Sequence, residues 1–392
     1  MKVLLYDTFR VIDAKGGTEK VFCNMANALV NLGYEVTALI FENKKGKPFF
    51  PLDSRVELIN AGIGFNSHNL INNFIALFSI SKHNRHIKRY NYKNKRIAEK
   101  IRPYLSQINP DVIISFTVEG TAILKNFVRT SKPVITMYHF NAEHIINDNK
   151  LSLSALKETE CIQTLLDRDV VITSQYINAK KFVTIPNVVP QYDKHSDLET
   201  KTIITVGRVC PLQKRQHILI EAFAKIASRY PDWQVEIYGE THLDKEYFDS
   251  MQEFIRKNKL KNIKFCGTTN DIVSKLKEAS IFAFPSAFEG FPLALTEAMS
   301  MGLASVGFRN CPAVNEIIKD GHNGILCEAS INSFSEALSK LMSDYNLRLK
   351  YGSNAREDMK CYAPEVIWNK WDAVIKEVYK ENKNSQTVEV GE

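Results

Sequence analysis

The sequence predicts an α/β protein built from two doubly wound, Rossmann-like domains, each a parallel sheet with helices on both faces. Three observations predict this class. The chain has 392 residues, whereas single domains cluster near about 100–150 residues. Short apolar segments rich in β-branched residues, typical of buried parallel strands, alternate with segments of helical periodicity. Hydrophobic residues make up 44% and charged residues 24%, a globular composition that excludes a disordered chain or a coiled coil.

Ten segments are predicted as buried strands. They cover residues 2–6, 35–41, 111–115, 133–137 and 169–173 in the first half, and 202–206, 234–238, 263–265, 281–284 and 304–306 in the second. Amphipathic helices are predicted between them, including one at 18–32 that stops at Gly33 and one at 216–229. Because strands and helices alternate, both sheets are expected to be parallel.

The first domain is expected to end near Pro186. Pro186 and Pro190 keep this segment extended, and polar residues follow up to Lys201. We therefore predict a first domain over 1–186, a linker over 187–200, a second domain over 201–363 and a helix over 364–382. That helix has apolar residues at helical spacing and needs a surface to cover, and residues 383–392 are expected to fray.

No apolar stretch reaches the ~18 residues that a membrane span needs. The most apolar segment, 70–80, is short and contains Asn72 and Asn73, and the amino terminus is too short for a signal-peptide core. Seven scattered cysteines, none in a C-x-x-C pair, argue against a disulfide framework or a zinc site. The sequence therefore predicts a protein of the reducing cytoplasm.

Ligands of open α/β sheets bind beyond the carboxyl ends of the strands, so the segments after the strands hold the candidate site residues. After the first strand, Gly16 and Gly17 open a helix, where the backbone can approach a ligand and helix amides favour an anion. After strand 133–137, His139 is placed to contact a substrate or carry a proton. A flexible turn and a satisfied histidine remain alternatives here.

The second half carries the stronger pattern. Arg208 and Lys214 follow strand 202–206 and suit a diphosphate, although a solvated basic loop is equally compatible. The segment after strand 281–284 leads into a helix. It supplies the carboxylates of Glu289 and Glu297 and the backbone amides of Gly290, Phe291 and Leu293. Free amides favour phosphate, and the carboxylates suit sugar hydroxyls. A capped helix with surface glutamates would not explain the Gly-Phe-Pro sequence.

These segments resemble the retaining GT-B glycosyltransferases of family 4, the glycosyl transferases group 1. The matching segments are the Glu289-x7-Glu297 block, Gly207-Arg208 with Lys214, and Asp320-Gly-His-Asn-Gly324-Ile-Leu. The resemblance extends over nearly the whole chain. It implies the GT-B architecture, in which the two parallel sheets face an interdomain cleft and a C-terminal helix crosses back to the first domain.

The resemblance also implies roles for the candidate residues. Arg208 and Lys214 would hold the donor diphosphate, Glu297 the ribose, and Glu289 with the amides of Gly290, Phe291 and Leu293 the sugar and phosphate. Gly16, Gly17 and His139 would line the transfer site from the first domain. In the family the lysine usually follows the arginine by five positions rather than six. We therefore infer a one-residue insertion, with Gln213 as the lesser alternative to Lys214.

No metal and no other cofactor is expected. Asp167-Arg168-Asp169 is similar to the D-x-D motif of the metal-dependent GT-A class. That motif follows a strand, whereas here it is expected to end a helix and precede the strand at 169–173. Fixed cations and a helix terminus would then neutralise the leaving diphosphate.

The expected function is transfer of a sugar from a nucleotide-diphosphate sugar, with UDP favoured, to a hydroxyl of a glycan or lipid-linked glycan with retention of configuration. The abundant Lys, Asn and Ile suggest an AT-rich bacterial genome, and hence surface polysaccharide or lipopolysaccharide assembly. Alternatives are a nucleotide-sugar epimerase of the same fold and a non-catalytic subunit of a transferase complex. The missing G-x-G-x-x-G motif disfavours a dehydrogenase.

The positive charge is concentrated in the first half. Residues 1–190 hold 25 Lys and Arg against 16 Asp and Glu, and the whole chain has a net charge of +7. The densest part is 82–102, whose basic residues include Lys82, Arg85, Lys88, Arg89, Lys93, Lys95 and Arg96. A solvated helix face is the alternative, and no motif supports a nucleic-acid partner. Because the resemblance places the acceptor in this domain, we expect peripheral binding to an anionic membrane.

Overall fold

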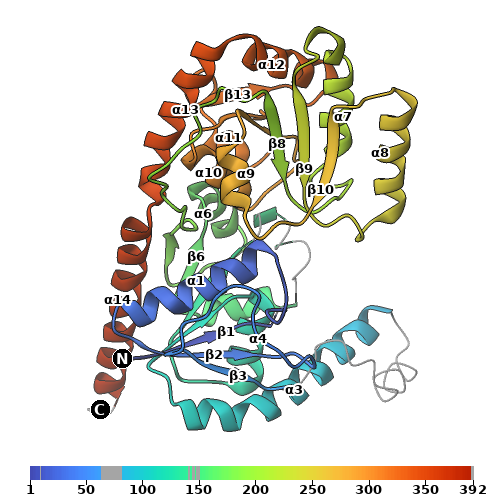
Figure 1. Ribbon diagram of the computed structural model, residues 1–392. Coiled ribbons are helices and arrows are strands. Elements are labelled where there is room, and N and C mark those ends of the chain that lie inside the picture. The colour runs from blue at the N-terminus through green and yellow to red at the C-terminus, as the bar shows by residue number, and fades with distance from the viewer. Residues whose placement is uncertain (9, 63–81, 140–141, 144–145, 147–150, 390–392) are drawn as a thin grey trace. The chain divides into compact units, whose positions relative to one another are not determined.

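The structure, a computed structural model, describes residues 1–8, 10–62, 82–139, 142–143, 146 and 151–389 (Figure 1). The chain divides into two compact units. The first comprises Met1–Pro186 together with Ile367–Glu392, and the second comprises Asn187–Val366. The apolar segment 70–80 lies outside the described residues.

The first unit is built on a seven-stranded sheet in which all neighbouring strands are parallel. Its strand order is β3-β2-β1-β4-β5-β6-β7. The strands are β1 (Lys2–Tyr6), β2 (Glu35–Ile40), β3 (Glu57–Asn60), β4 (Val112–Ser115), β5 (Val134–Tyr138), β6 (Cys161–Thr164) and β7 (Phe182–Thr184). The order 3-2-1-4-5-6 within it is that of a dinucleotide-type Rossmann sheet, with its switch point between β1 and β4.

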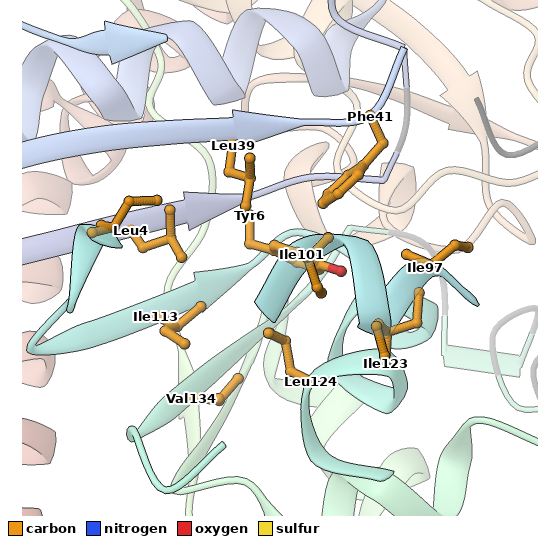
Figure 2. Close-up of a cluster of buried hydrophobic side chains, with 12 residues drawn as sticks. Leu4, Tyr6, Leu39, Phe41, Ile97, Ile101, Ile113, Ile123, Leu124 and Val134 are labelled. Atoms are coloured by element: carbon orange, nitrogen blue, oxygen red, sulfur yellow. The ribbon is translucent and has the colours of Figure 1, made fainter. Parts of the chain in front are cut away.

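Helices cover both faces of this sheet (Figure 1). They are α1 (Gly17–Asn31), α3 (Lys82–Ile108), α4 (Val118–Ala122), the π-helical η1 (Ile123–Val128), the 3-10 helix η2 (Leu153–Glu158), α6 (Asp167–Ser174) and α14 (Pro364–Glu389). Figure 2 shows how α3, η1 and the strands meet in one buried cluster. In it Ile97 and Ile101 of α3 pack against Tyr6 of β1 and Ile113 of β4. One face of α3 is thereby committed to the core.

The second unit repeats the plan with a six-stranded parallel sheet, ordered β10-β9-β8-β11-β12-β13. Its strands are β8 (Thr202–Val206), β9 (Gln234–Tyr238), β10 (Ile263–Gly267), β11 (Ile281–Phe284), β12 (Ala304–Phe308) and β13 (Gly324–Cys327). Its helices are α7 (Gln216–Ala224), η3 (Ala227–Arg229), α8 (Lys245–Lys257), α9 (Ile272–Lys277), α10 (Leu293–Ser300), α11 (Val314–Ile317), α12 (Ile331–Ser343), α13 (Tyr345–Met359) and η4 (Lys360–Tyr362). The predicted fold class, with two parallel Rossmann-like sheets, is confirmed.

The C-terminal helix belongs to the first unit from Ile367 onward, as the predicted fold requires. The Tyr34 hydroxyl donates to Asp372 Oδ1 at 2.7 Å, and Lys181 forms an ion pair with Glu377. The apolar residues Ile367, Trp371, Val374, Ile375 and Val378 of this helix are buried, so the helix covers part of this unit. The helix runs to Glu389, so the prediction that residues from 383 onward fray is wrong up to that point.

Three further predictions differ from the structure. Residues 169–173 are not a strand but part of α6. In this helix Val171 is 62% exposed, whereas Ile172 packs against a buried cluster. The helix predicted over 216–229 ends at Ala224, after which η3 follows. The four strands β3, β6, β7 and β13 were not predicted. Each is only three or four residues long, and β3, β6 and β7 also contain polar side chains. All seven cysteines are free.

A buried arginine joins the linker to the helices of the second unit. The Arg348 guanidinium donates to the carbonyl oxygens of Leu341 at 2.7 Å and of Leu198 at 3.2 Å. It lies between two aromatic rings, 5.2 Å from the centroid of Trp233 and 5.3 Å from that of Tyr345. Because the group is buried, these carbonyls and rings replace the water that it loses.

We expect Arg348→Met to destabilise the second unit by about 2–4 kcal/mol, since charged hydrogen bonds contribute roughly 1.5–3 kcal/mol each and are not additive. Urea denaturation followed by circular dichroism measures this. The matched control is Lys350→Met on the exposed side of the same helix, which should change stability by less than about 0.5 kcal/mol. Equal stability of the two variants would mean that desolvation of the buried charge cancels its hydrogen bonds.

Candidate functional site

The two central strands of the second sheet, β8 and β11, are neighbours, and the winding reverses between them. Ligands of doubly wound sheets bind at this switch point, beyond the carboxyl ends of the strands. The loop after β8 covers residues 207–215, and the loop after β11 covers 285–292. Most of the site residues predicted for this unit lie in these two loops.

Gly239 fixes the start of the β8 loop. A Cβ at this position would lie 1.9 Å from the carbonyl oxygen of Gly207, and its φ of +152° is one that side chains rarely adopt. The Val209 N–H donates to the Glu240 oxygen at 3.0 Å. The backbone on both sides of Arg208 is therefore held against the loop after β9.

Lys214 and Glu289, one from each loop, form an ion pair. Their Nζ and Oε1 atoms are 2.6 Å apart, and the side chains are only 16% and 8% exposed. The ammonium also lies 4.8 Å from the centroid of the Phe284 ring, within the range of a cation–π contact. In so dry a setting a charge without its partner is costly. The two residues predicted from the sequence are thus brought together, and each neutralises the other.

The neighbours of the lysine hold the two loops together. Arg215, with a φ of +48°, donates from Nε and Nη2 to the oxygens of Pro285 and Ser286 at 3.1 and 3.2 Å. The Gln213 amide donates to Glu289 Oε2 at 3.4 Å. Gln213, the lesser alternative to Lys214, therefore also contacts Glu289, but Lys214 forms the ion pair. The structural role of Arg215 was missed, because nothing in the sequence separates it from a solvated basic residue.

Arg208 presents an open cation. Its side chain is exposed, and no acid pairs with it among the residues that the structure describes. Its carbonyl oxygen accepts from Gln216 Nε2 at 2.9 Å, and Gln216 Oε1 accepts from the Cys210 N–H at 3.3 Å, so its backbone is fixed. Of the two predicted cations, one is paired and the other is available to an anion.

The start of α10 offers fewer free amides than predicted. The Leu293 N–H donates to the Phe291 oxygen at 2.9 Å, so the prediction of a free amide there is wrong. The reason is Pro292, whose φ of −81° and ψ of 75° form a tight inverse γ-turn. Within the described chain the amides of Gly290 and Phe291 have no acceptor. The Phe291 ring packs edge-on against Tyr362, with centroids 5.4 Å apart.

Glu297 lies buried inside α10. Burial and, to a smaller extent, the charge of Glu297 raise the pKa of Tyr192, so these two side chains interact. The linker that carries Tyr192 packs on α10, where the Ser300 hydroxyl donates to the Pro190 oxygen at 2.5 Å. Sequence reasoning missed Tyr192, because only the folded chain brings the linker to this helix.

The Asp320-Gly-His-Asn-Gly324 segment has a structural role. Asp320 Oδ1 accepts from the Leu326 N–H at 2.9 Å, and its other oxygen pairs with Arg309 at 2.6 Å. The Asn323 amide donates to Asp358 Oδ2 at 2.8 Å. These contacts shape the turn before β13.

In the first unit, His139 follows β5. Its ring stacks on Phe116 with centroids 5.2 Å apart, and its buried Nε2 has no hydrogen-bond partner within the described chain. Burial lowers the pKa of His139 to about 4. The imidazole is therefore neutral near pH 7 and suited to a hydroxyl rather than to a phosphate.

Gly16 caps α1 and Gly17 begins it. A Cβ at Gly16 would lie 2.2 Å from Glu19 Oε2, because the Glu19 carboxylate folds back over the helix start. An anionic substrate at this helix terminus must displace that carboxylate.

The predicted position of Asp167-Arg168-Asp169 is wrong. These residues follow β6 and begin α6, because the acidic side chains favour a helix N-terminus. Arg168 pairs with Glu143 at 3.1 Å, and Asp169 Oδ1 accepts from the Ala142 N–H at 3.4 Å. In the described part of the chain, no group of three or more His, Cys, Asp or Glu side chains is arranged to hold a metal.

The basic segment 82–102 lies on α3, opposite its core face. Four of its predicted residues are exposed, namely Lys88, Arg89, Lys95 and Arg96, while Arg85 and Lys93 are half-buried. Lys93 pairs with Glu119 at 3.2 Å, and the side chain of Lys82 is outside the described part. Within that part, no helix is both long enough and apolar enough to cross a membrane.

Residues 191–358, inside the second unit, match the family Glycosyl transferases group 1. An uncharacterized glycosyltransferase of Haemophilus influenzae is 25% identical over 381 residues, 93% of this chain and 97% of the relative. These two matches support the identification of this chain as a glycosyltransferase. The amylovoran biosynthesis glycosyltransferase AmsD of Erwinia amylovora is 22% identical over 380 residues, again 93% and 97%.

An Escherichia coli glycosyltransferase, UDP-Gal:alpha-D-GlcNAc-diphosphoundecaprenol alpha-1,3-galactosyltransferase, is 31% identical over 201 residues, 47% of this chain and 51% of the relative. Two solved structures share the fold. Sucrose-phosphate synthase from Thermosynechococcus elongatus has a TM-score of 0.77 at 13% identity, covering 97% of this chain and 99% of that one. TarM of S. aureus, solved with UDP, has a TM-score of 0.75 at 15% identity, covering 96% and 100%. The architecture is GT-B.

The burial of His139 predicts a pH dependence of stability for the first unit. The unfolded chain takes up a proton near pH 6.5, whereas the folded one does so only near pH 4. The unfolded state therefore binds more protons between these values, and the stability of the first unit falls as the pH drops from about 6.5 to about 4. His139→Gln cannot titrate and should lose less stability in this window. Urea midpoints at pH 7.5 and pH 5 measure this, and an identical decline in both proteins would contradict it.

Proposed function

We propose that this protein is a retaining glycosyltransferase of family 4 that transfers a sugar from a nucleotide-diphosphate sugar, with UDP-sugar favoured, to a glycan or lipid-linked glycan. The observation that carries the proposal is the buried Lys214–Glu289 pair beside the exposed Arg208 at the switch point of the second unit. The E. coli relative's name supports it, because it states a UDP-galactose donor and a diphosphoundecaprenol-linked acceptor. The Erwinia relative's name supports a role in bacterial surface polysaccharide or lipopolysaccharide assembly.

The second unit, over 201–363, takes the donor. Arg208 binds the diphosphate as a planar fork, and the amides of Gly290 and Phe291 add two donors to phosphate. The Glu297 carboxylate accepts hydrogen bonds from the ribose hydroxyls. A diphosphate beside Lys214 gives the ammonium a second anionic partner, so its hold on Glu289 weakens. The Glu289 carboxylate is then released to bind the hydroxyls of the donor sugar, which couples diphosphate binding to sugar binding.

The transfer breaks the bond between the sugar C1 and the diphosphate oxygen and forms a bond from the acceptor oxygen to C1 on the same face. The acceptor proton passes to the departing phosphate oxygen. Negative charge grows on the leaving diphosphate, where Arg208, Lys214 and the loop amides stabilise it. We propose that these groups replace a metal ion and that no cofactor is needed. The first unit takes the acceptor, with Gly16, Gly17 and the neutral His139 lining its side.

The acceptor side also binds a membrane in this proposal. The exposed face of α3 carries Lys88, Arg89, Lys95 and Arg96, with Arg85 and Lys93 at its flanks and Lys82 at the start of the helix. Its core face is occupied by Ile97 and Ile101, and the four exposed cations lie on its solvent-exposed side. Anionic lipid is the partner that suits such a helix. We place the protein in the cytoplasm, peripherally at the inner face of the cell membrane, with no nucleic-acid partner.

The donor site is tested by calorimetric UDP titration of three variants. Arg208→Ala and Glu297→Ala should each weaken UDP binding by roughly 1.5–3 kcal/mol, the contribution of a charged hydrogen bond. Glu289→Gln should bind UDP at least as tightly as the wild type, because it frees the Lys214 ammonium, yet it should transfer sugar slowly. The control Lys225→Ala removes an exposed cation of the same unit and should leave both quantities unchanged.

Transfer assays for these variants run in excess EDTA, where wild-type activity should persist. Normal UDP affinity in both Arg208→Ala and Glu297→Ala would remove the donor site from this loop pair. Activity lost in EDTA and restored by Mg²⁺ would show that a metal neutralises the diphosphate.

Membrane binding is tested by sedimentation with phosphatidylglycerol vesicles. Since each basic side chain near an anionic leaflet contributes about 1 kcal/mol, replacing Lys88, Lys95 and Arg96 by Ser should weaken binding by roughly 100-fold, and high salt should weaken it further. The matched control replaces three exposed cations of the second unit by Ser, namely Lys225, Lys259 and Lys350. Equal vesicle binding by the two triple variants would mean that the α3 residues form an ordinary solvated helix face and do not bind the membrane.

A further inference from the structure

Two loops of the first unit, far apart in sequence, form one surface at the carboxyl edge of its sheet. Residues 10–15 follow β1, and residues 42–49 follow β2. Ile12 pairs with Pro48 in an antiparallel bridge, and the Asp13 N–H donates to the Lys47 oxygen at 3.2 Å. A Cβ at Gly46 would lie 2.8 Å from Ile12 Cγ2, so glycine permits this approach. We call residues 10–15 and 42–49 the basic flap.

A buried carboxylate organises the basic flap from below. The side chain of Glu42 is buried, and its Oε1 accepts from the N–H groups of Val11 at 2.5 Å and Ile12 at 2.8 Å. Its own N–H donates to Asn60 Oδ1 at 2.9 Å, and the Asn60 amide donates to the Lys44 oxygen at 3.0 Å. The Glu42 carboxylate is therefore occupied by backbone hydrogen bonds inside the flap, and the backbone that carries the lysines is fixed.

The outer side of the flap is strongly positive. Its exposed cations are Arg10, Lys15, Lys44, Lys45 and Lys47, and its one exposed acid is Asp13, which pairs with Lys44 at 2.6 Å. Arg10, Lys45 and Lys47 have no anionic partner within the described part of the chain. An exposed aromatic ring adjoins these charges. The Lys15 ammonium lies 4.8 Å from the centroid of Phe49, which is 39% exposed.

We propose that the basic flap binds the diphosphate of a lipid-linked acceptor, with Phe49 against the hydrocarbon next to the diphosphate. This inference rests on the lipid-linked acceptor of the proposed function. The flap follows β1 and β2 at the edge where ligands of such sheets bind. Several exposed lysines in two paired loops suit a diphosphate, which carries more charge than a single cation can neutralise. The flap is a different surface from the membrane-facing residues of α3 and acts on the acceptor head group itself.

The test is calorimetry on the full chain with saturating UDP, so that the donor site is filled. The probes are inorganic pyrophosphate and farnesyl diphosphate, both without membrane. Replacing Lys44, Lys45 and Lys47 by Ser should weaken binding of both probes at least 10-fold. Phe49→Ala should weaken farnesyl diphosphate more than pyrophosphate. The Lys225, Lys259 and Lys350 control and the α3 triple variant should bind both probes as the wild type does.

UDP affinity is measured in every variant and should not change, which separates this inference from the donor assignment. If UDP binding fails in the wild type, the proposed function fails while the flap result still stands on its own titration. No binding of either probe to the UDP-loaded wild type, or unchanged binding in the lysine variant, would overturn the flap site. If the lysine variant loses only binding to phosphatidylglycerol vesicles, the flap binds the membrane surface and not the acceptor diphosphate.

Discussion

One ion pair connects the two loops on which the second unit's site depends. The β8 and β11 strands are adjacent in the sheet, with Ile281 opposite Ile203, although about 75 residues separate them. Parallel pairing brings their carboxyl ends to one place, and the Lys214–Glu289 contact then closes the loops over the switch point. Because both charges are buried, neither can leave without a replacement partner. The Lys214–Glu289 pair therefore stays closed until a ligand supplies that replacement.

Much of the fold could be predicted from the sequence, because most of its strands are short and continuously apolar. The failures have physical causes. Strand β6 contains Gln163, a polar residue that a buried strand accepts only because its amide donates to the Ile185 oxygen at 2.6 Å and to the Thr164 oxygen at 3.0 Å. The segment at 169–173 has the composition of a strand but follows the acidic start of a helix. Local composition alone could reveal neither the hydrogen bonds of Gln163 nor the helix that begins before 169–173.

The site was predictable as a set of residue types and not as a geometry. The spacing of Glu289 and Glu297, and the cations after β8, predicted a site in two loops that the structure brings together through the Lys214–Glu289 pair. The pairing of Lys214 with Glu289, the γ-turn at Pro292 and the approach of Tyr192 to α10 all depend on contacts between distant segments. The basic flap could not be predicted for the same reason, because its cations form one surface only when residues 42–49 lie beside residues 10–15.

The last helix has a consequence for how the chain is made. Residues Pro364–Val366 of α14 belong to the second unit, and the remainder of the helix belongs to the first. The first unit is thus assembled from segments that precede and follow the second unit in the sequence. Domains generally fold as units during synthesis, starting from the amino terminus. Here the first unit leaves the ribosome without the helix that buries Trp371 and Ile375, and its surface for that helix stays uncovered until the entire second unit has been translated.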